Sequence, residues 1–232
     1  QYTHMDPLTE IGIKHDTDKA TVHKFTSLYE QYFRSRRYDE MTILELGILN
    51  GKSLLTLQEY FPNATIHAID INKESVREYG PRIHTYLCSQ DDESKLNELF
   101  SDMAFDIIID DGSHMTLHQL KSLSILFEKV KPGGMYVCED LHTSLIQSYV
   151  NSETIPLRLF ENYDGKIPEI EPKRNEYINN TLQEIKVYKR DVNGYKCYRC
   201  SSVNEKRFEI CETCSADVST KNLSYTSILF KK

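Results

Sequence analysis

The sequence predicts an α/β fold with a seven-stranded, mostly parallel sheet that ends in an antiparallel hairpin. Between residues 42 and 138, five short apolar runs alternate with four amphipathic segments, an order typical of strand–helix repeats. The runs are too apolar for a sheet with one face in water, so we expect helices on both faces. Two further strand-like segments, separated by a cluster of cysteines, follow near the C-terminus and complete the sheet.

The predicted elements follow one another in a regular order. The parallel strands are expected at Thr42–Leu46, Thr65–Ile69, Ile83–Leu87, Phe105–Ile109 and Met135–Cys138. The helices between them are expected at Lys52–Tyr60, Lys73–Tyr79, Asp92–Ser101 and Thr116–Val130, the last stopped by Lys131–Gly134. The hairpin is expected from two alternating segments, Leu182–Lys189 and Ser224–Phe230.

One domain with one insertion is expected from the length of 232 residues. Residues 1–40 form an N-terminal segment, and the apolar stripe of its amphipathic helix, Ala20–Arg36, is typical of packing against a core. Residues 41–232 form the domain itself. Within it, residues 141–181 are long for a connection, which is typical of a lid or substrate-binding region. Residues 195–218 hold the cysteine cluster.

The composition argues against several classes of protein. The chain has 35 acidic and 28 basic side chains and a formal net charge of −7, a balance that does not favour binding to nucleic acid. It contains no apolar run of about 18 residues, so no membrane span is predicted. No signal peptide is recognisable, and we expect a cytoplasmic location.

A strand-to-helix turn with two glycines predicts a cofactor site. Glu45 lies near the end of the first strand, Gly47, Asn50 and Gly51 follow it, and Asp70 ends the second strand. Such a turn at a helix N-terminus, with a carboxylate nearby for the two ribose hydroxyls, is typical of nucleotide-like ligands. The glycine spacing of a dinucleotide site is missing, which favours S-adenosylmethionine over a nicotinamide cofactor. A turn that needs glycine only for its own geometry is the alternative.

The third and fourth strands add three residues to the predicted cofactor set. Ser89 and Gln90 follow the third strand, where an adenine would lie and where both side chains suit a purine edge. A helix cap formed by Ser89, Asp91 or Asp92 is the alternative and, taken alone, the simpler interpretation. Asp110, at the end of the fourth strand, is included in the cofactor set.

Acidic residues and a histidine follow two neighbouring strands. Asp111 and His114 come after the fourth strand, and Glu139 and Asp140 after the fifth. Because adjacent parallel strands lie about 4.8 Å apart, the three carboxylates can share one cation that relieves their repulsion. All-oxygen ligation favours Mg²⁺ or Mn²⁺, and a histidine beside the cation can accept a proton near neutral pH. Solvated acids that cap the following helices are the alternative.

Several segments resemble one family. The core from Glu45 to His142 resembles the S-adenosylmethionine-dependent methyltransferases. Four segments together resemble the metal-dependent sugar O-methyltransferases of the macrocin and mycinamicin type, namely Asp16–Lys19, Phe25–Glu30, Asp111–His114 and Glu139–Ser144. The resemblance implies a Rossmann-like methyltransferase fold, S-adenosylmethionine as cofactor, and a sugar or glycoside as acceptor. It also implies Mg²⁺ held by Asp111, Glu139 and Asp140, with His114 as general base. Related enzymes often form homo-oligomers.

The cysteine cluster is not part of that family pattern. Two Cys-x-x-Cys pairs, formed by Cys197, Cys200, Cys211 and Cys214, have the spacing of a structural zinc site closed by four thiolates. We expect it to brace the hairpin or to mediate a protein contact.

The leading hypothesis is therefore an Mg²⁺-dependent O-methyltransferase in which Asp111 and His114 are catalytic. A catechol or other vicinal diol is the alternative acceptor. A zinc-ribbon binding protein on an inactive methyltransferase scaffold is the alternative function. The acceptor, its methylated hydroxyl and the oligomeric state are left open by the sequence.

Overall fold

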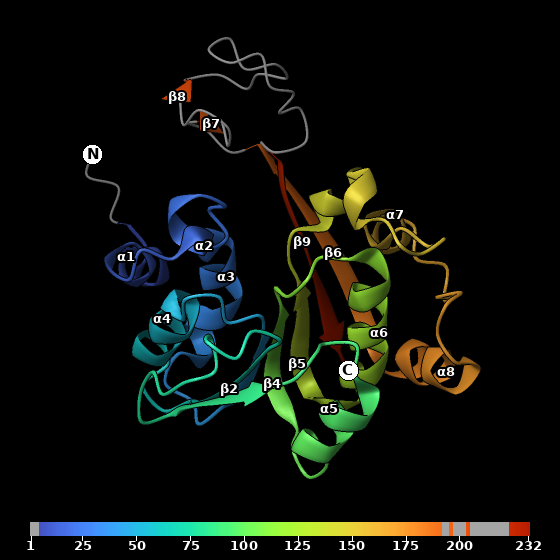
Figure 1. Ribbon diagram of the computed structural model, residues 1–232, viewed down its shortest axis with the longest axis horizontal. Coiled ribbons are helices and arrows are strands. Elements are labelled where there is room, and N and C mark those ends of the chain that lie inside the picture. The colour runs from blue at the N-terminus through green and yellow to red at the C-terminus, as the bar shows by residue number, and fades with distance from the viewer. Residues whose placement is uncertain (1–4, 192–194, 197–202, 205–222) are drawn as a thin grey trace.

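The computed structural model describes residues 5–191, 195–196, 203–204 and 223–232 and shows a sheet covered by helices on both faces (Figure 1). Within these residues, the central sheet has seven strands in the order β3-β2-β1-β4-β5-β9-β6. Their bounds are Thr42–Leu46 (β1), Thr65–Asp70 (β2), Ile83–Leu87 (β3), Phe105–Asp110 (β4), Val130–Cys138 (β5), Leu182–Asp191 (β6) and Leu223–Lys231 (β9). Strands β1 to β5 are parallel, and β9 runs antiparallel to both β5 and β6. The predicted seven-stranded sheet with its C-terminal hairpin is confirmed.

Side chains alternate between the two faces of the sheet along each strand, and apolar side chains on both faces explain why helices cover both. In β4, Ile107 and Ile109 belong to one hydrophobic cluster and Ile108 to the other, because successive side chains point to opposite faces. The first cluster is completed by α1 (Pro7–Lys14), α3 (Thr26–Phe33) and α4 (Lys52–Tyr60). The second is completed by α5 (Glu93–Phe100), α6 (Thr116–Leu126), α7 (Pro156–Glu161) and α8 (Pro172–Thr181).

The predicted helix at Ala20–Arg36 is interrupted. α2 (Asp18–Thr21) ends before α3 begins, and the turn η1 (Arg34–Arg36) follows α3. Lys24 between α2 and α3 is left-handed, with φ of 59°, and the amide of Phe25 donates to the carbonyl of Lys19 at 2.7 Å. This break turns the start of the segment toward the sheet. Helix α1 was not predicted, although Asp6 caps it by accepting from the amide of Thr9 at 2.8 Å and proline opens its first turn.

The predicted helix at Lys73–Tyr79 is wrong, because the structure has turns there. The side chain of Asn72 accepts from the amide of Glu74 at 3.0 Å, and the hydroxyl of Ser75 donates to the carbonyl of Leu49 at 2.9 Å. The first bond gives the local backbone an alternative to helical pairing, and the second ties Ser75 to the turn after β1.

The prediction that Lys131–Gly134 ends the fourth helix is also wrong, because the helix ends earlier. α6 ends at Leu126, the turn η2 (Phe127–Lys129) follows, and β5 has already begun at Val130. Lys131–Gly134 therefore lies inside β5, where the pairing shifts between Phe105↔Val130 and Ile107↔Met135. The extra residues form an irregularity at which Gly133 has a φ of 74°.

The region from 141 to 181 is mostly helical. It contains the turns η3 (Leu141–Leu145) and η4 (Gln147–Tyr149) before α7 and α8. α7 and α8 pack on the α6 side of the sheet, α7 also against β6 and η3 (Figure 1). Outside the sheet, β7 (Tyr195–Lys196) pairs with β8 (Val203–Asn204). The four cysteines of the predicted zinc site lie outside the described residues. Among the described helices, none has the length and apolar character needed to cross a membrane.

Candidate active site

The turn after β1 forms one wall of the site. Gly47, Leu49 and Gly51 are left-handed, with φ of 94°, 51° and 78°. A Cβ atom on Gly47 would lie 2.2 Å from the carbonyl oxygen of Asp111, so only glycine fits where this turn passes the loop after β4. The predicted close-approach turn is present, and its closest contact is with the protein's own backbone.

Asp70 fastens this turn from the end of β2. Its Oδ2 accepts from the amides of Ile48 at 2.8 Å and Leu49 at 3.1 Å, and its Oδ1 accepts from the amide of Asn72 at 2.7 Å. The carboxylate thus supports the turn. Its predicted contact with ribose hydroxyls stays a prediction.

Two adjoining cavities lie along the strand ends and share Gly47, Asp70 and Gly112. The first, of about 160 Å³, is also lined by Ile69, Ile71, Cys88, Ser89, Gln90, Ser113 and His118. The second, of about 300 Å³, is also lined by Thr17, Asp18, Glu45, Ile48, Leu49, Asn50, Ser53, Asn72, Ser75, Asp111, His114 and Asp140. Of the predicted cofactor residues, Gly51 and Asp110 line neither cavity. Gly51 is instead the N-cap residue of α4.

Asp110 and Gln90 contact each other and neighbouring protein groups, and their predicted contact with the cofactor stays a prediction. Asp110 is buried, and it accepts from Gln90 Nε2 at 3.0 Å and from the hydroxyl of Tyr136 at 2.9 Å. Gln90 Oε1 accepts from the amide of Ser113 at 2.6 Å. Both groups of the Gln90 amide are therefore engaged by protein, and the pair holds the loop after β4 in place. Asp92 caps α5 by accepting from Lys95, which confirms the helix-cap alternative at that position.

Lys19 is the residue that sequence reasoning missed. Its ammonium donates to Oδ2 of Asp111 and, at 2.8 Å, to Oε2 of Glu139, and it lies 3.4 Å from Oε1 of Glu45. The hydroxyl of Tyr29 donates to the other oxygen of Glu139 at 2.7 Å. Lys19, Glu45 and Glu139 are all buried. Part of the acidic cluster is thus neutralised by a lysine from α2.

Charge and burial shift the pKa values in this cluster in opposite directions. Burial raises the pKa of Glu139 well above its ordinary value and that of Glu45 to about 7. Burial alone would lower the pKa of Lys19, but attraction to Asp111, Glu139 and Glu45 outweighs it and raises that pKa well above the usual range. Although burial opposes it, attraction to His23, His114 and His142 lowers the pKa of Asp140.

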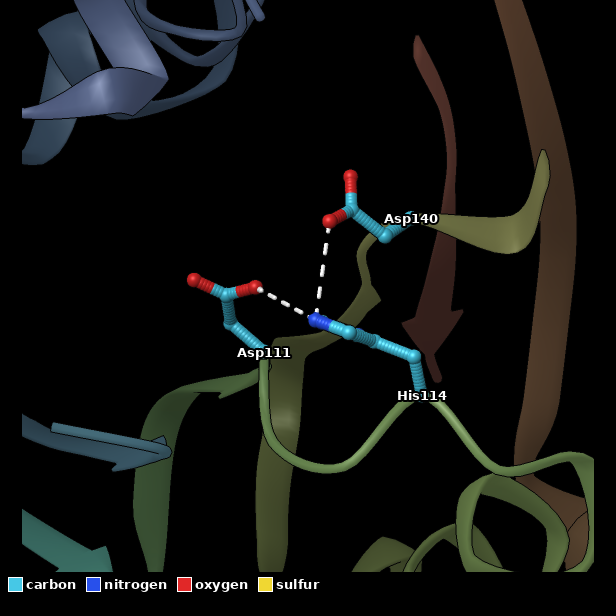
Figure 2. A group of neighbouring side chains, drawn as sticks. All are labelled: Asp111, His114 and Asp140. Atoms are coloured by element: carbon cyan, nitrogen blue, oxygen red, sulfur yellow. Dashed lines mark ion pairs between the residues drawn. The ribbon is translucent and has the colours of Figure 1, made fainter. Parts of the chain in front are cut away.

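Asp111, His114 and Asp140 form the part of the cluster that faces the larger cavity. Figure 2 shows both carboxylates directed at Nε2 of His114, which lies 3.9 Å from Oδ1 of Asp111 and 3.6 Å from Oδ2 of Asp140. His114 and Asp140 are left-handed, with φ of 58° and 54°. Such conformations are costly for non-glycine residues and concentrate at functional sites.

These residues fit a divalent cation. Asp111, His114 and Asp140 each offer one ligand atom, and the three atoms lie within 4.8 Å of one another. Among the described residues, Oδ1 of Asp140 and Nδ1 of His114 are buried without a hydrogen-bond partner. Carboxylate oxygens are the preferred ligands of Mg²⁺ and Mn²⁺. Glu139, the third predicted ligand, has both oxygens engaged by Lys19 and Tyr29, and its role as a ligand stays a prediction.

The region 141–181, predicted to form a lid or to bind substrate, contains Tyr149, Arg158 and Tyr163. The ring centroid of Tyr149 lies 6.5 Å from that of His114. Tyr163 donates to Oδ1 of Asn179 at 2.6 Å, and Arg158 is exposed on α7. None of these three residues lines either cavity, and their contact with an acceptor stays a prediction.

The sheet order and the site at its strand ends are those of a Rossmann-like methyltransferase fold. The MycE methyltransferase from the mycinamycin biosynthetic pathway, solved in complex with Mg and SAH, matches with a TM-score of 0.67 at 25% identity. The match covers 99% of this chain and 55% of that chain.

Curated proteins extend this likeness to sequence. The 8-demethyl-8-alpha-L-rhamnosyl tetracenomycin-C 2'-O-methyltransferase of Streptomyces olivaceus is 37% identical over 145 residues, which are 59% of this chain and 38% of that protein. The demethylmacrocin O-methyltransferase of Streptomyces fradiae is 38% identical over 146 residues, 59% of this chain and 37% of that protein. No protein-family model matches. The match therefore spans less than half the length of each of these two curated proteins. The chain is similar in sequence and in fold to sugar O-methyltransferases of the macrocin and mycinamicin type, which confirms the predicted resemblance.

Proposed function

We propose that this chain is an S-adenosylmethionine-dependent, Mg²⁺-dependent O-methyltransferase that acts on a hydroxyl of a sugar or glycosylated small molecule. One observation carries the proposal. The cavity of about 300 Å³ is lined on one side by the turn after β1 and on the other by Asp111, His114 and Asp140. A methyl donor bound against the turn and an acceptor bound against the acids would therefore meet in one space.

The chain's own residues supply positioning and proton transfer. Asp111 and Asp140, and Glu139 once released from its present partners, would hold the cation. When bound, the cation would make an acceptor hydroxyl more acidic. Nε2 of His114 lies among the same carboxylates and is placed to accept that proton. The turn after β1 and Asp70 would orient S-adenosylmethionine, whose sulfonium carries the methyl group.

Two finer proposals concern the rest of the molecule. Structural zinc at Cys197, Cys200, Cys211 and Cys214 is supported by their spacing alone. Assembly into a homo-oligomer is supported only by the fact that related enzymes often form homo-oligomers.

The test is a transfer assay with S-adenosylmethionine and a panel of glycosides and catechols, with Mg²⁺ or with EDTA. We expect methylation of a glycoside that EDTA abolishes. His114→Ala should remove turnover while calorimetry still detects S-adenosylhomocysteine binding. His84→Ala, at an exposed position on β3, is the matched control and should behave as wild type. Full activity in EDTA, or methylation of catechols alone, would contradict the proposal.

A further inference from the structure

The ammonium of Lys19 occupies the inner part of the acidic cluster. It contacts Asp111, Glu139 and Glu45, and its side chain is 6% exposed. An ammonium has three N–H donors, and three carboxylates surround this one. Lys19 is 92 residues before Asp111 and 120 before Glu139, so the contact joins the N-terminal segment to the strand ends.

Two of the three carboxylates are also predicted to hold the cation. Mg²⁺ binds oxygen at about 2.1 Å and demands near-octahedral geometry, so Oδ2 of Asp111 and Oε2 of Glu139 cannot serve it well while they accept hydrogen bonds from Lys19. Two positive charges on the same oxygens would also repel each other strongly in a buried site. Binding of the Lys19 ammonium to these carboxylates therefore weakens binding of the divalent cation, and binding of the divalent cation weakens that of the ammonium.

We propose that Lys19 and the divalent cation compete for Asp111 and Glu139, so that cation binding releases the Lys19 side chain. The inference rests on the proposed function only in assuming that a cation binds here. The Lys19 ammonium keeps the buried acids paired when no cation is bound, and thereby limits cation affinity. The larger cavity adjoins Lys19, because it is lined by Asp111, which Lys19 contacts, and by Thr17 and Asp18, which precede Lys19 in the chain.

The first test measures cation affinity. Mn²⁺ binding to wild type, Lys19→Met and Lys24→Met is followed by the electron paramagnetic resonance signal of free Mn²⁺. Lys24 is exposed in the same segment, and its loss changes the net charge equally. Because Lys19→Met frees two carboxylates, it should bind Mn²⁺ about tenfold more tightly or better, and Lys24→Met should match wild type. Unchanged or weaker binding by Lys19→Met would overturn the competition.

The second test uses the wild-type protein and does not depend on the variant folding. Amines are acetylated with an N-hydroxysuccinimide ester, with and without Mn²⁺, and peptides are read by mass spectrometry. Lys19 should become reactive when Mn²⁺ is added. Lys231 is buried and donates to the carbonyls of Phe127 and Val130, so it should stay protected. Lys14, with a side chain 63% exposed, should react in both conditions.

The outcomes separate this inference from the proposed function. If Mn²⁺ binds and Lys19 is still protected from acetylation, the competition is overturned, but the proposed cation-dependent activity is not. Absence of Mn²⁺ binding in wild type and in Lys19→Met overturns both.

Discussion

The hydroxyl of Thr143 donates to the carbonyl oxygen of Asp140 at 2.8 Å, and the carbonyl of His114 lies 3.2 Å from the same hydroxyl. Thr143 thus contacts the backbone of His114 and of Asp140, two left-handed residues that line the larger cavity. Each such conformation costs about 1–3 kcal/mol and persists only when its surroundings hold it. Thr143 is therefore a positioning residue for His114 and Asp140.

Thr143→Val should separate this role from simple packing, because valine keeps the shape and removes the hydroxyl. We expect kcat to fall about tenfold or more while the KM for S-adenosylmethionine changes little. Thr143→Ser keeps the hydroxyl and should retain most of kcat. Steady-state kinetics on folded variants checks both, and equal kcat values for Thr143→Val and wild type would refute the role.

Gly47 offers a second prediction about the site's architecture. Gly47→Ala adds a Cβ atom 2.2 Å from the carbonyl of Asp111, whereas Gly133, at a similar φ of 74°, has nothing within 4 Å of its added Cβ. Gly133→Ala should lower the free energy of unfolding by about 1 kcal/mol, the usual cost of a left-handed alanine. Gly47→Ala should cost more and weaken S-adenosylhomocysteine binding.

Urea unfolding and calorimetry measure these two effects. Similar stability losses for Gly47→Ala and Gly133→Ala, with cofactor affinity intact in both, would show that close approach to Asp111 is unimportant.

The strands and the strand-end acids were predictable because their signals are local. Buried parallel strands must be apolar on both faces, and Asp111, Glu139 and Asp140 follow such runs directly. The contact of Lys19 with these acids depends on packing across more than ninety residues and on a break at Lys24 that no propensity indicates. One signal did exist, since acids without a local basic residue require a positive partner. The sequence could not distinguish a metal ion from an ammonium.

The roles of Gln90 and Asp110 show a different limit. An amide after a strand can bind a purine edge or a backbone amide with the same groups, and the sequence alone does not indicate that Gln90 accepts from the amide of Ser113. The helix expected at Lys73–Tyr79 is absent for a related reason, since the side chain of Asn72 bonds the local backbone and Ser75 is tied to the distant turn at Leu49.

His67 predicts how stability depends on pH. Burial lowers the pKa of this histidine to about 4, with a smaller contribution from His84, and its Nδ1 lies 2.9 Å from the hydroxyl of Tyr86. Unfolded histidine titrates near 6.5. Between these two values the unfolded chain binds a proton that the folded chain does not, so stability present above pH 6.5 is lost as pH falls toward 4.

The loss assigned to His67 is up to about 3 kcal/mol. Chemical unfolding of wild type and His67→Phe at pH 7, 5.5 and 4.5 should show a steeper decline for wild type, since phenylalanine fills the site without titrating. Parallel declines would assign the acid sensitivity to other groups.

The zinc prediction is tested by comparing two kinds of cysteine. Purified wild-type protein should contain one zinc ion per chain by elemental analysis, and Cys197→Ser or Cys211→Ser should lose it, because a closed site needs four thiolates. Cys88 and Cys138 are buried free thiols, so Cys88→Ser and Cys138→Ser are the controls and should keep the metal. If Cys88→Ser or Cys138→Ser lost zinc as readily, or if wild type contained none, the spacing of the four cysteines would need another explanation.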